Sequence, residues 1–206
     1  MAVAAVATAL AVALRVWVQV VGPLPGERWA LAEFPPWPPR TGVVGELVVF
    51  FDLLGRPLFA AAGLAIAVWL LLRASRRRDA VLIVAASAGV AVNAVLKVVS
   101  GTTPLWAESH ADPGLNYPSG HTVHIVVFAG ALAVMAHRQG RRDLVFLALI
   151  PIVLTGPTRV LNGAHLISDV IAGYLIGVAW LALVVVLVGR GARRELRRWP
   201  PRSHST

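Results

Sequence analysis

His165 and Asp169 are the pair of residues in this sequence best suited to chemistry. They are four positions apart, so on a helix they share one face. A carboxylate beside an imidazole fixes its tautomer, and an imidazole held in this way can attack phosphorus. Arg159, on the N-terminal side of this pair, carries a planar guanidinium that matches phosphate oxygens. The alternative is a structural His–Asp hydrogen bond that joins two helices.

A second group is the run Pro118-Ser119-Gly120-His121, which precedes a long apolar stretch. Proline and serine in front of an apolar run predict the start of a helix, with Ser119 as its cap. Gly120 lets a ligand approach the backbone, and the free N–H groups of a helix start favour an anion. His121 can donate a proton to a leaving oxygen. The alternative is an ordinary capped helix.

Lys97 is the third candidate, at the end of an apolar run that is followed by Ser100-Gly101-Thr102-Thr103-Pro104. Its ammonium group is a point charge suited to a phosphate oxygen. The alternative is a lysine whose apolar stem lies in the membrane and whose charge reaches the interface.

The composition predicts that a lipid bilayer surrounds these residues. Of 206 residues, 57% are hydrophobic and 14% are charged, whereas soluble domains have about 25% charged residues. The chain has no cysteine, which excludes disulfides and thiolate sites. The net charge of +9 comes with arginines in short clusters between apolar runs, a pattern typical of membrane proteins, so we expect no nucleic-acid partner.

We therefore expect an all-α, polytopic membrane protein with about six transmembrane helices. A spanning helix needs roughly 20 mostly apolar residues. The first apolar run lacks a preceding basic residue, so we expect an uncleaved span and not a signal peptide. The proline-rich stretch 23–40 predicts a loop without regular helix, and residues 47–54 are too few to span. The predicted spans are about 2–22, 57–73, 80–99, 121–137, 143–160 and 166–189.

The arginine clusters predict the orientation of these spans. Arginines gather at 73–78, at 138–142 and after residue 190, and such connections stay in the cytoplasm. Both termini are then cytoplasmic, and the loops around 23–56, 100–120 and 161–165 lie outside. This topology places all the candidate residues at the extracytoplasmic ends of their spans. The agreement supports the topology, because the arginine clusters and the motifs are independent observations.

Taken together, Lys97, Pro118-Ser119-Gly120-His121 and Thr158-Arg159 followed by His165 and Asp169 resemble the type-2 phosphatidic acid phosphatase family. The resemblance covers about residues 47–189. It implies a helical bundle like that of the lipid phosphate phosphatases, undecaprenyl-diphosphate phosphatases and vanadium haloperoxidases. We expect one membrane-embedded domain over 1–206, with a basic cytoplasmic tail at 190–206.

The resemblance also implies a role for each residue. His165 would attack phosphorus and become phosphohistidine, Asp169 would orient it, and His121 would protonate the leaving group. The phosphoryl oxygens would be held by Lys97, Arg159, Ser119 and the Gly120 backbone. The family uses neither a cofactor nor a metal for this chemistry.

One position departs from the family pattern. The first motif of the family contains an arginine, whereas both possible alignments here place Thr103 or Pro104 at that position. A lost oxyanion donor typically costs about 2.7–4 kcal/mol of transition-state stabilisation. We hypothesise that His110 or Arg56 compensates for the missing arginine.

The predicted function is a membrane lipid phosphatase in the cell inner or plasma membrane, acting on a lipid phosphate or an isoprenoid (undecaprenyl-type) diphosphate at the extracytoplasmic face. Phosphatidic acid, phosphatidylglycerophosphate and prenyl-linked sugar phosphates are alternative substrates. The non-enzyme alternatives are a transporter, which would usually place ionisable groups near the midplane in repeated halves, and a catalytically impaired scaffold. The oligomeric state stays open.

Overall fold

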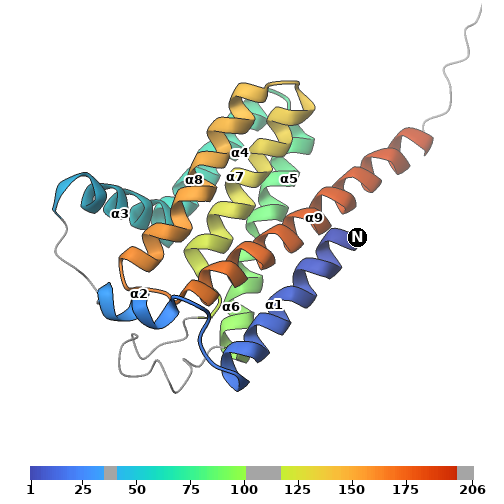
Figure 1. Cartoon of the computed structure of the whole chain (residues 1–206). Helices are drawn as coiled ribbons and strands as arrows, with labels where there is room; N and C mark the ends of the chain where they lie inside the picture. Colours follow the sequence, from blue (N-terminus) through green and yellow to red (C-terminus); the bar gives the residue numbers. More distant parts are fainter. Residues whose placement is uncertain (35–40, 101–116, 199–206) are drawn as a thin grey trace, which may run out of the picture.

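The fold was analysed in a computed structural model that describes residues 1–34, 41–100 and 117–198. Every regular element in these ranges is a helix, which confirms the predicted all-α class (Figure 1). The helices are α1 (Ala2–Val20), α2 (Glu27–Glu33), α3 (Gly42–Gly55), α4 (Pro57–Arg73), α5 (Arg77–Ser87), α6 (Gly89–Ser100), α7 (Gly120–Arg138), α8 (Arg142–Leu161) and α9 (Ile167–Arg198).

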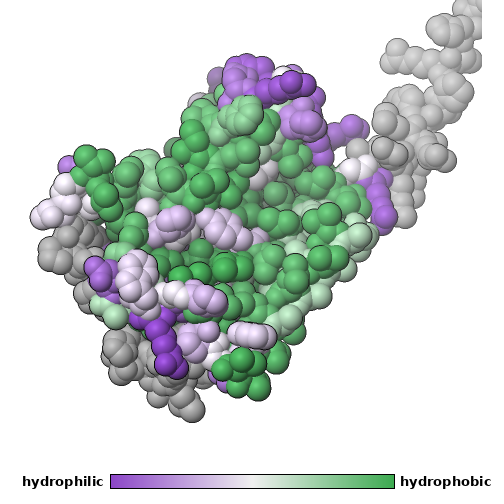
Figure 2. All heavy atoms as spheres, viewed as in Figure 1, coloured by the Kyte–Doolittle hydropathy of each residue, from purple (hydrophilic) through white to green (hydrophobic). Residues whose placement is uncertain are grey.

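Five helical segments among the described residues are long and apolar enough to cross a membrane, and a sixth is possible if α3 and α4 are counted as one bent span. These numbers agree with the prediction of about six spans. On the face that Figure 2 shows, hydrophobic residues cover the middle of the bundle and hydrophilic residues gather towards its two ends. Large apolar side chains such as Val12, Leu70 and Val153 are exposed on the helix surfaces. Lipid tails would cover such side chains.

The segment from Pro23 to Arg40 contains a short helix, so the prediction of a loop without regular helix is wrong for Glu27–Glu33. Nine residues without proline separate Pro25 from Pro35, and seven of them form the two turns of α2. Gly26 starts the helix with a φ of 82°, a conformation that glycine adopts without strain. The side chain of Glu27 is buried and bonds the backbone of Ser168, which holds the helix in place. The local sequence does not reveal this contact.

α3 and α4 meet at a 66° bend, where Arg56 separates them and Pro57 starts α4. Proline is favoured at the first position of a helix and disfavours an α-helical conformation for the residue before it. The predicted turn at Gly55-Arg56-Pro57 is therefore present, and the predicted surface segment 47–54 belongs to the longer helix α3. Figure 1 shows α3 pointing away from the bundle.

α7 is the central helix, since it packs against α8, α9 and α5. Leu82 and Ile83 of α5 and Val123 and Val127 of α7 are fully buried in one apolar cluster. α7 and α9 approach closely, because a Cβ atom added at Gly173 would lie 2.8 Å from the Thr122 Cβ. Glycine thus sets the distance between the two helices that carry His121 and Asp169.

α8 contains two prolines, and a tyrosine from α9 compensates for one of them. Pro157 has no N–H to donate to the Val153 carbonyl, and the Tyr174 hydroxyl lies 3.4 Å from that oxygen. The Tyr174 hydroxyl donates to the Ile152 carbonyl at 2.7 Å and accepts the Gly156 N–H at 3.1 Å. In a bilayer, where water does not satisfy freed backbone groups, such a bond stabilises the interrupted helix.

The connections between α4 and α5 and between α7 and α8 lie at the same end of the bundle, where Figure 2 shows a hydrophilic cap. Arg76 of the first connection contacts Gln139 of the second at 3.4 Å. The start of α9, the end of α8, the start of α7 and helix α2 lie at the opposite end (Figure 1). The two arginine-rich connections therefore lie at the end of the bundle opposite to the starts of α7 and α9.

Candidate active site

His165 and Asp169 form the centre of the candidate site, at the start of α9. His165 Nδ1 lies 3.4 Å from Asp169 Oδ2, and the two side chains are 8% and 4% exposed. The same carboxylate oxygen accepts the backbone N–H of Leu166 at 3.2 Å, so Asp169 also caps its own helix. With Nδ1 facing the carboxylate, Nε2 is the nitrogen left to act as a nucleophile.

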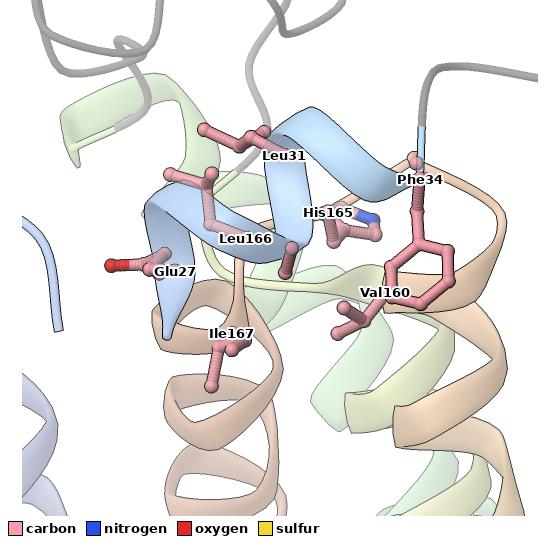
Figure 3. Close-up of a pocket in the computed structure, with 9 residues that line it drawn as sticks. Glu27, Leu31, Phe34, Val160, His165, Leu166 and Ile167 are labelled. Carbon is pink, nitrogen blue, oxygen red and sulfur yellow. The ribbon is translucent and has the colours of Figure 1, made fainter. Parts of the chain in front are cut away.

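Helix α2 covers this pair. In Figure 3, His165 lies beneath α2 between Leu166 and Val160, with Phe34 at its side. The pocket at this point has a volume of about 10 Å³, which has room for a water-sized group. The His165 side chain is therefore shielded from bulk solvent on its α2 side.

Glu27 attaches α2 to the start of α9. Its side chain is fully buried, Oε1 accepts the Ser168 N–H at 2.8 Å, and Oε2 accepts the Leu24 N–H at the same distance. A carboxylate at a helix N-terminus satisfies backbone N–H groups that have no partner within the helix and interacts favourably with the helix dipole. Glu27 thus fixes the helix end that carries the candidate nucleophile.

The second motif lies directly against the third. The Ser119 N–H donates to the Asp169 carbonyl oxygen at 3.0 Å, which joins the start of α7 to the start of α9. Ser119 is fully buried and its hydroxyl accepts from Thr122 at 3.1 Å. Accepting this bond does not occupy the O–H of Ser119, so its donation to a phosphate oxygen stays a prediction.

Lys97 at the end of α6 lies beside Gly120. A Cβ atom added at Gly120 would lie 3.8 Å from Lys97 Cε, an ordinary van der Waals distance, so the lysine side chain passes next to the Gly120 backbone. The charges of Lys97, Arg159 and Asp169 all act on His165. The structure thus brings the cations of α6 and α8 to the imidazole of the candidate nucleophile.

Arg159 at the end of α8 is buried and makes an ion pair that the sequence did not predict. Its Nη1 donates to Asp52 Oδ1 at 2.6 Å, and both side chains are 6% exposed. Asp52 Oδ2 accepts from Arg56 Nε at 3.1 Å and from Arg56 Nη2 at 2.9 Å. A carboxylate from α3 therefore joins the predicted phosphate-binding arginine to the predicted compensating arginine.

His121 lies against the same turn of α3. Its Nε2 lies 3.2 Å from the Asp52 carbonyl oxygen and 3.7 Å from Asp52 Oδ1. The ring contacts the backbone at Gly55 so closely that a Cβ atom there would overlap it. The site is therefore built from five helices, with α3 added to the four that the sequence predicted.

Burial lowers the pKa of His165 below its ordinary value of 6.5. The hydrogen bond and the charge of Asp169 oppose this effect, whereas Arg159 and Lys97 add to it. A lowered pKa keeps the imidazole neutral near pH 7, which is the form that a nucleophile needs.

Two residues of this site, Asp52 and Glu27, were missed by sequence reasoning. A signal for Asp52 was present, since it interrupts the apolar run from Leu47 to Leu54 and Arg56 follows four residues later. For Glu27 there was no such signal, because its partner Ser168 is 141 residues away. His110, the other proposed compensating cation, and the Thr103-Pro104 position lie outside the described residues.

Known proteins resemble parts of this chain in sequence and in fold. Residues 97–193 match the model of the PAP2 superfamily. A lipid A 1-phosphatase from Rhizobium johnstonii is 38% identical over 73 residues, which are 35% of this chain and 28% of the relative. The chain thus spans less than a third of the length of that relative.

A crystal structure of a transmembrane PAP2-type phosphatidylglycerolphosphate phosphatase from Bacillus subtilis has the same fold, with a TM-score of 0.68. The superposition covers 97% of this chain and 100% of the other chain at 18% identity. This likeness confirms the predicted class of helical bundle. Residues 97–193 therefore match the PAP2 superfamily, and the chain has the fold of a transmembrane PAP2-type phosphatase structure.

Proposed function

We propose that this protein is a membrane lipid phosphatase that removes a phosphoryl group from a lipid phosphate or an isoprenoid diphosphate. The observation that carries the proposal is the convergence of the His165–Asp169 pair with Arg159, Lys97 and His121 at one end of the bundle. A nucleophile with its orienting carboxylate, two cations and a second imidazole are the parts that phosphoryl transfer requires.

The reaction would proceed in two displacements. His165 Nε2 attacks phosphorus, a P–N bond forms, and the P–O bond to the lipid breaks while His121 gives its proton to the departing oxygen. Water then attacks the phosphohistidine, His121 takes up the proton of that water, and the P–N bond breaks to release inorganic phosphate. Asp169 stabilises the positive imidazole in both steps.

Arg159 and Lys97 would hold the phosphoryl oxygens, and Ser119 and the Gly120 backbone would add hydrogen bonds. We further propose that Arg56 replaces the arginine that the first motif lacks. The distances support this role, since Arg56 and Arg159 bind opposite oxygens of one carboxylate. Guanidinium groups at this spacing suit a tetrahedral anion.

The active site would face the extracytoplasmic side. The candidate residues lie at the end of the bundle opposite to the arginine-rich connections, which the positive-inside rule assigns to the cytoplasm (Figures 1 and 2). A lipid headgroup in the outer leaflet could reach this depth while its tails remain in the bilayer. Both names among the relatives, a lipid A phosphatase and a phosphatidylglycerolphosphate phosphatase, support a phosphorylated lipid as substrate.

Phosphate release by the purified protein tests the proposal. The panel contains an undecaprenyl-type diphosphate, phosphatidic acid, phosphatidylglycerophosphate and a prenyl-linked sugar phosphate, each with and without chelator. We expect release from at least one lipid, unchanged by chelator, and loss of release in His165→Ala. His137→Ala is the matched control, because this exposed histidine lies at the opposite end of α7. Activity that survives in His165→Ala would rule out the mechanism.

The orientation has a separate test. The chain has no cysteine, so single cysteines report their own accessibility. We expect a membrane-impermeant maleimide to label Glu33→Cys in intact cells and Arg142→Cys only after permeabilisation, since the two exposed residues lie at opposite ends of the bundle. The reverse pattern would place the site in the cytoplasm.

A further inference from the structure

The carboxylate of Asp52 lies between the cationic groups of the site. It is 4% exposed and uses both oxygens, one for the guanidinium of Arg159 and one for that of Arg56. Asp52 comes from α3 and Arg159 from α8, with 107 residues between them. A single side chain thus joins the bend between α3 and α4 to the end of α8.

This arrangement settles the geometry of Arg159 before a substrate arrives. A buried guanidinium without a counter-charge is strongly unfavourable, and an arginine held by a short carboxylate bond has one orientation. Groups that are ordered in advance stabilise a transition state without reorganising during the reaction. The 2.6 Å bond between Arg159 and Asp52 therefore orients the Arg159 guanidinium before substrate binds. It also packs α3 against α8.

Arg56 depends on the same carboxylate. Its side chain is 52% exposed, so a free arginine at this position would sample many rotamers in water. Both Arg56 nitrogens that bind Asp52 contact the same oxygen, at 2.9 and 3.1 Å. The carboxylate thus directs the half-exposed guanidinium towards the buried one.

His121 is held by the same residue. Its Nε2 lies 3.2 Å from the Asp52 carbonyl oxygen, and the Gly55 backbone packs against the ring. The carboxylate oxygen that binds Arg159 is 3.7 Å from the same nitrogen. One helical turn, from Asp52 to Arg56, therefore carries one group with a proposed role, Arg56, and contacts two others, Arg159 and His121.

We propose that Asp52 is a positioning residue of the phosphatase site, which holds Arg56 and Arg159 as a pair of phosphate-binding guanidinium groups and orients His121. The inference rests on the proposed function and goes beyond it, because it explains how a chain without the first-motif arginine acquires a second guanidinium. Asp52 acts through its neighbours and does not contact the substrate.

The test is a double-mutant cycle of Asp52→Asn and Arg56→Ala. We expect kcat/KM to fall about 10- to 100-fold in Asp52→Asn, as for other residues that orient a catalytic group. If Asp52 acts by positioning Arg56, Arg56→Ala lowers kcat/KM in the wild type and has little further effect in Asp52→Asn. Multiplicative losses in the double variant would overturn the inference.

Asp79→Asn is the matched control. Asp79 pairs with Arg76 at 2.8 Å at the opposite end of the bundle, so the same chemical change removes an Arg–Asp bond far from the site. We expect kcat/KM to stay within about twofold of the wild type. A loss equal to that of Asp52→Asn would mean that the effect is general destabilisation.

A second readout does not depend on turnover. Inorganic phosphate should raise the thermal unfolding midpoint of the wild type, and this shift should be smaller in Asp52→Asn and Arg56→Ala but unchanged in Asp79→Asn. If Asp52→Asn does not fold, Arg56→Lys carries the test, because lysine lacks the planar fork that binds Asp52. An Arg56→Lys variant with wild-type kcat/KM and wild-type phosphate shift would refute the inference.

The two proposals fail in different ways. An inactive wild type, or an active His165→Ala variant, would reject the proposed reaction. The rise of the unfolding midpoint with inorganic phosphate would then still test whether Asp52 positions the phosphate-binding groups. An active wild type with an inactive His165→Ala and a fully active Asp52→Asn retains the reaction and rejects the positioning role.

Discussion

Glu27 offers the sharpest test of how the start of α9, next to His165, is held in place. Its fully buried carboxylate accepts one N–H from Ser168 on α9 and one from Leu24, each at 2.8 Å. Glu27→Gln keeps the size of the side chain but replaces one acceptor oxygen by an NH₂ group. Two donors then face each other, so one buried N–H loses its partner.

The expected loss follows from these two bonds. A hydrogen bond to a charged group contributes about 1.5–3 kcal/mol, so Glu27→Gln should lower the free energy of unfolding by about that amount. Glu27→Ala removes both bonds and should lower it by about 3–6 kcal/mol. For a chain of this length, the glutamine variant should unfold roughly 3–12 °C below the wild type.

Thermal unfolding of the purified protein in detergent measures this difference. Glu33→Gln is the control, since Glu33 lies on the same helix and is exposed. We expect its midpoint to equal that of the wild type. A Glu27→Gln variant as stable as Glu33→Gln would refute the reasoning, because the two bonds would then contribute nothing.

Three further predictions concern the chemistry and the packing of the site. Because burial holds the pKa of His165 below 6.5 and the nucleophile must be neutral, kcat/KM should fall towards acid pH with a midpoint below 6.5, in a profile measured from pH 4 to 9. Gly55→Ala would press a methyl group against the His121 ring and should lower kcat/KM about 10- to 100-fold in steady-state assays. Gly173→Ala, whose Cβ would lie 2.8 Å from the Thr122 Cβ, should force α7 and α9 apart and cost about 1–3 kcal/mol in unfolding experiments.

Each of these predictions has an outcome that contradicts it. An acid midpoint above pH 6.5 would exclude a neutral, buried His165 as the titrating nucleophile. Gly63→Ala is the control for Gly55→Ala, because the nearest atom to its new methyl group is 3.9 Å away. Equal kcat/KM values for the two variants would contradict the steric argument. Gly189→Ala has open space around the methyl group, so a loss of stability equal to that of Gly173→Ala would contradict the packing argument.

Much of this architecture is predictable from sequence because it depends on local patterns. A span is set by the number of consecutive apolar residues, so the predicted range 57–73 coincides with α4 and 143–160 differs from α8 by one residue at each end. The i, i+4 spacing predicts that His165 and Asp169 share a face, and they contact each other at 3.4 Å. These relations involve neighbours along the chain.

The parts that escaped prediction depend on contacts between distant segments. The 66° bend turns α3 so that Asp52 reaches Arg159, and no local pattern specifies the angle of a bend. The short helix α2 has its buried carboxylate bound to α9, a contact that only the folded chain reveals. Tertiary contacts of this kind decide the conformation of short segments whose local preferences are weak.

The hydroxyl of Tyr174 has a mechanical consequence for Arg159. It enters the interrupted turn of α8 near Pro157, where it bonds both the Ile152 carbonyl and the Gly156 N–H. Tyr174 thereby joins the final segment of α8 to α9 at a position about one turn after Asp169. When other helices of the bundle shift, the Arg159 guanidinium and the His165 imidazole should therefore move together. The distance between these two groups should then change little.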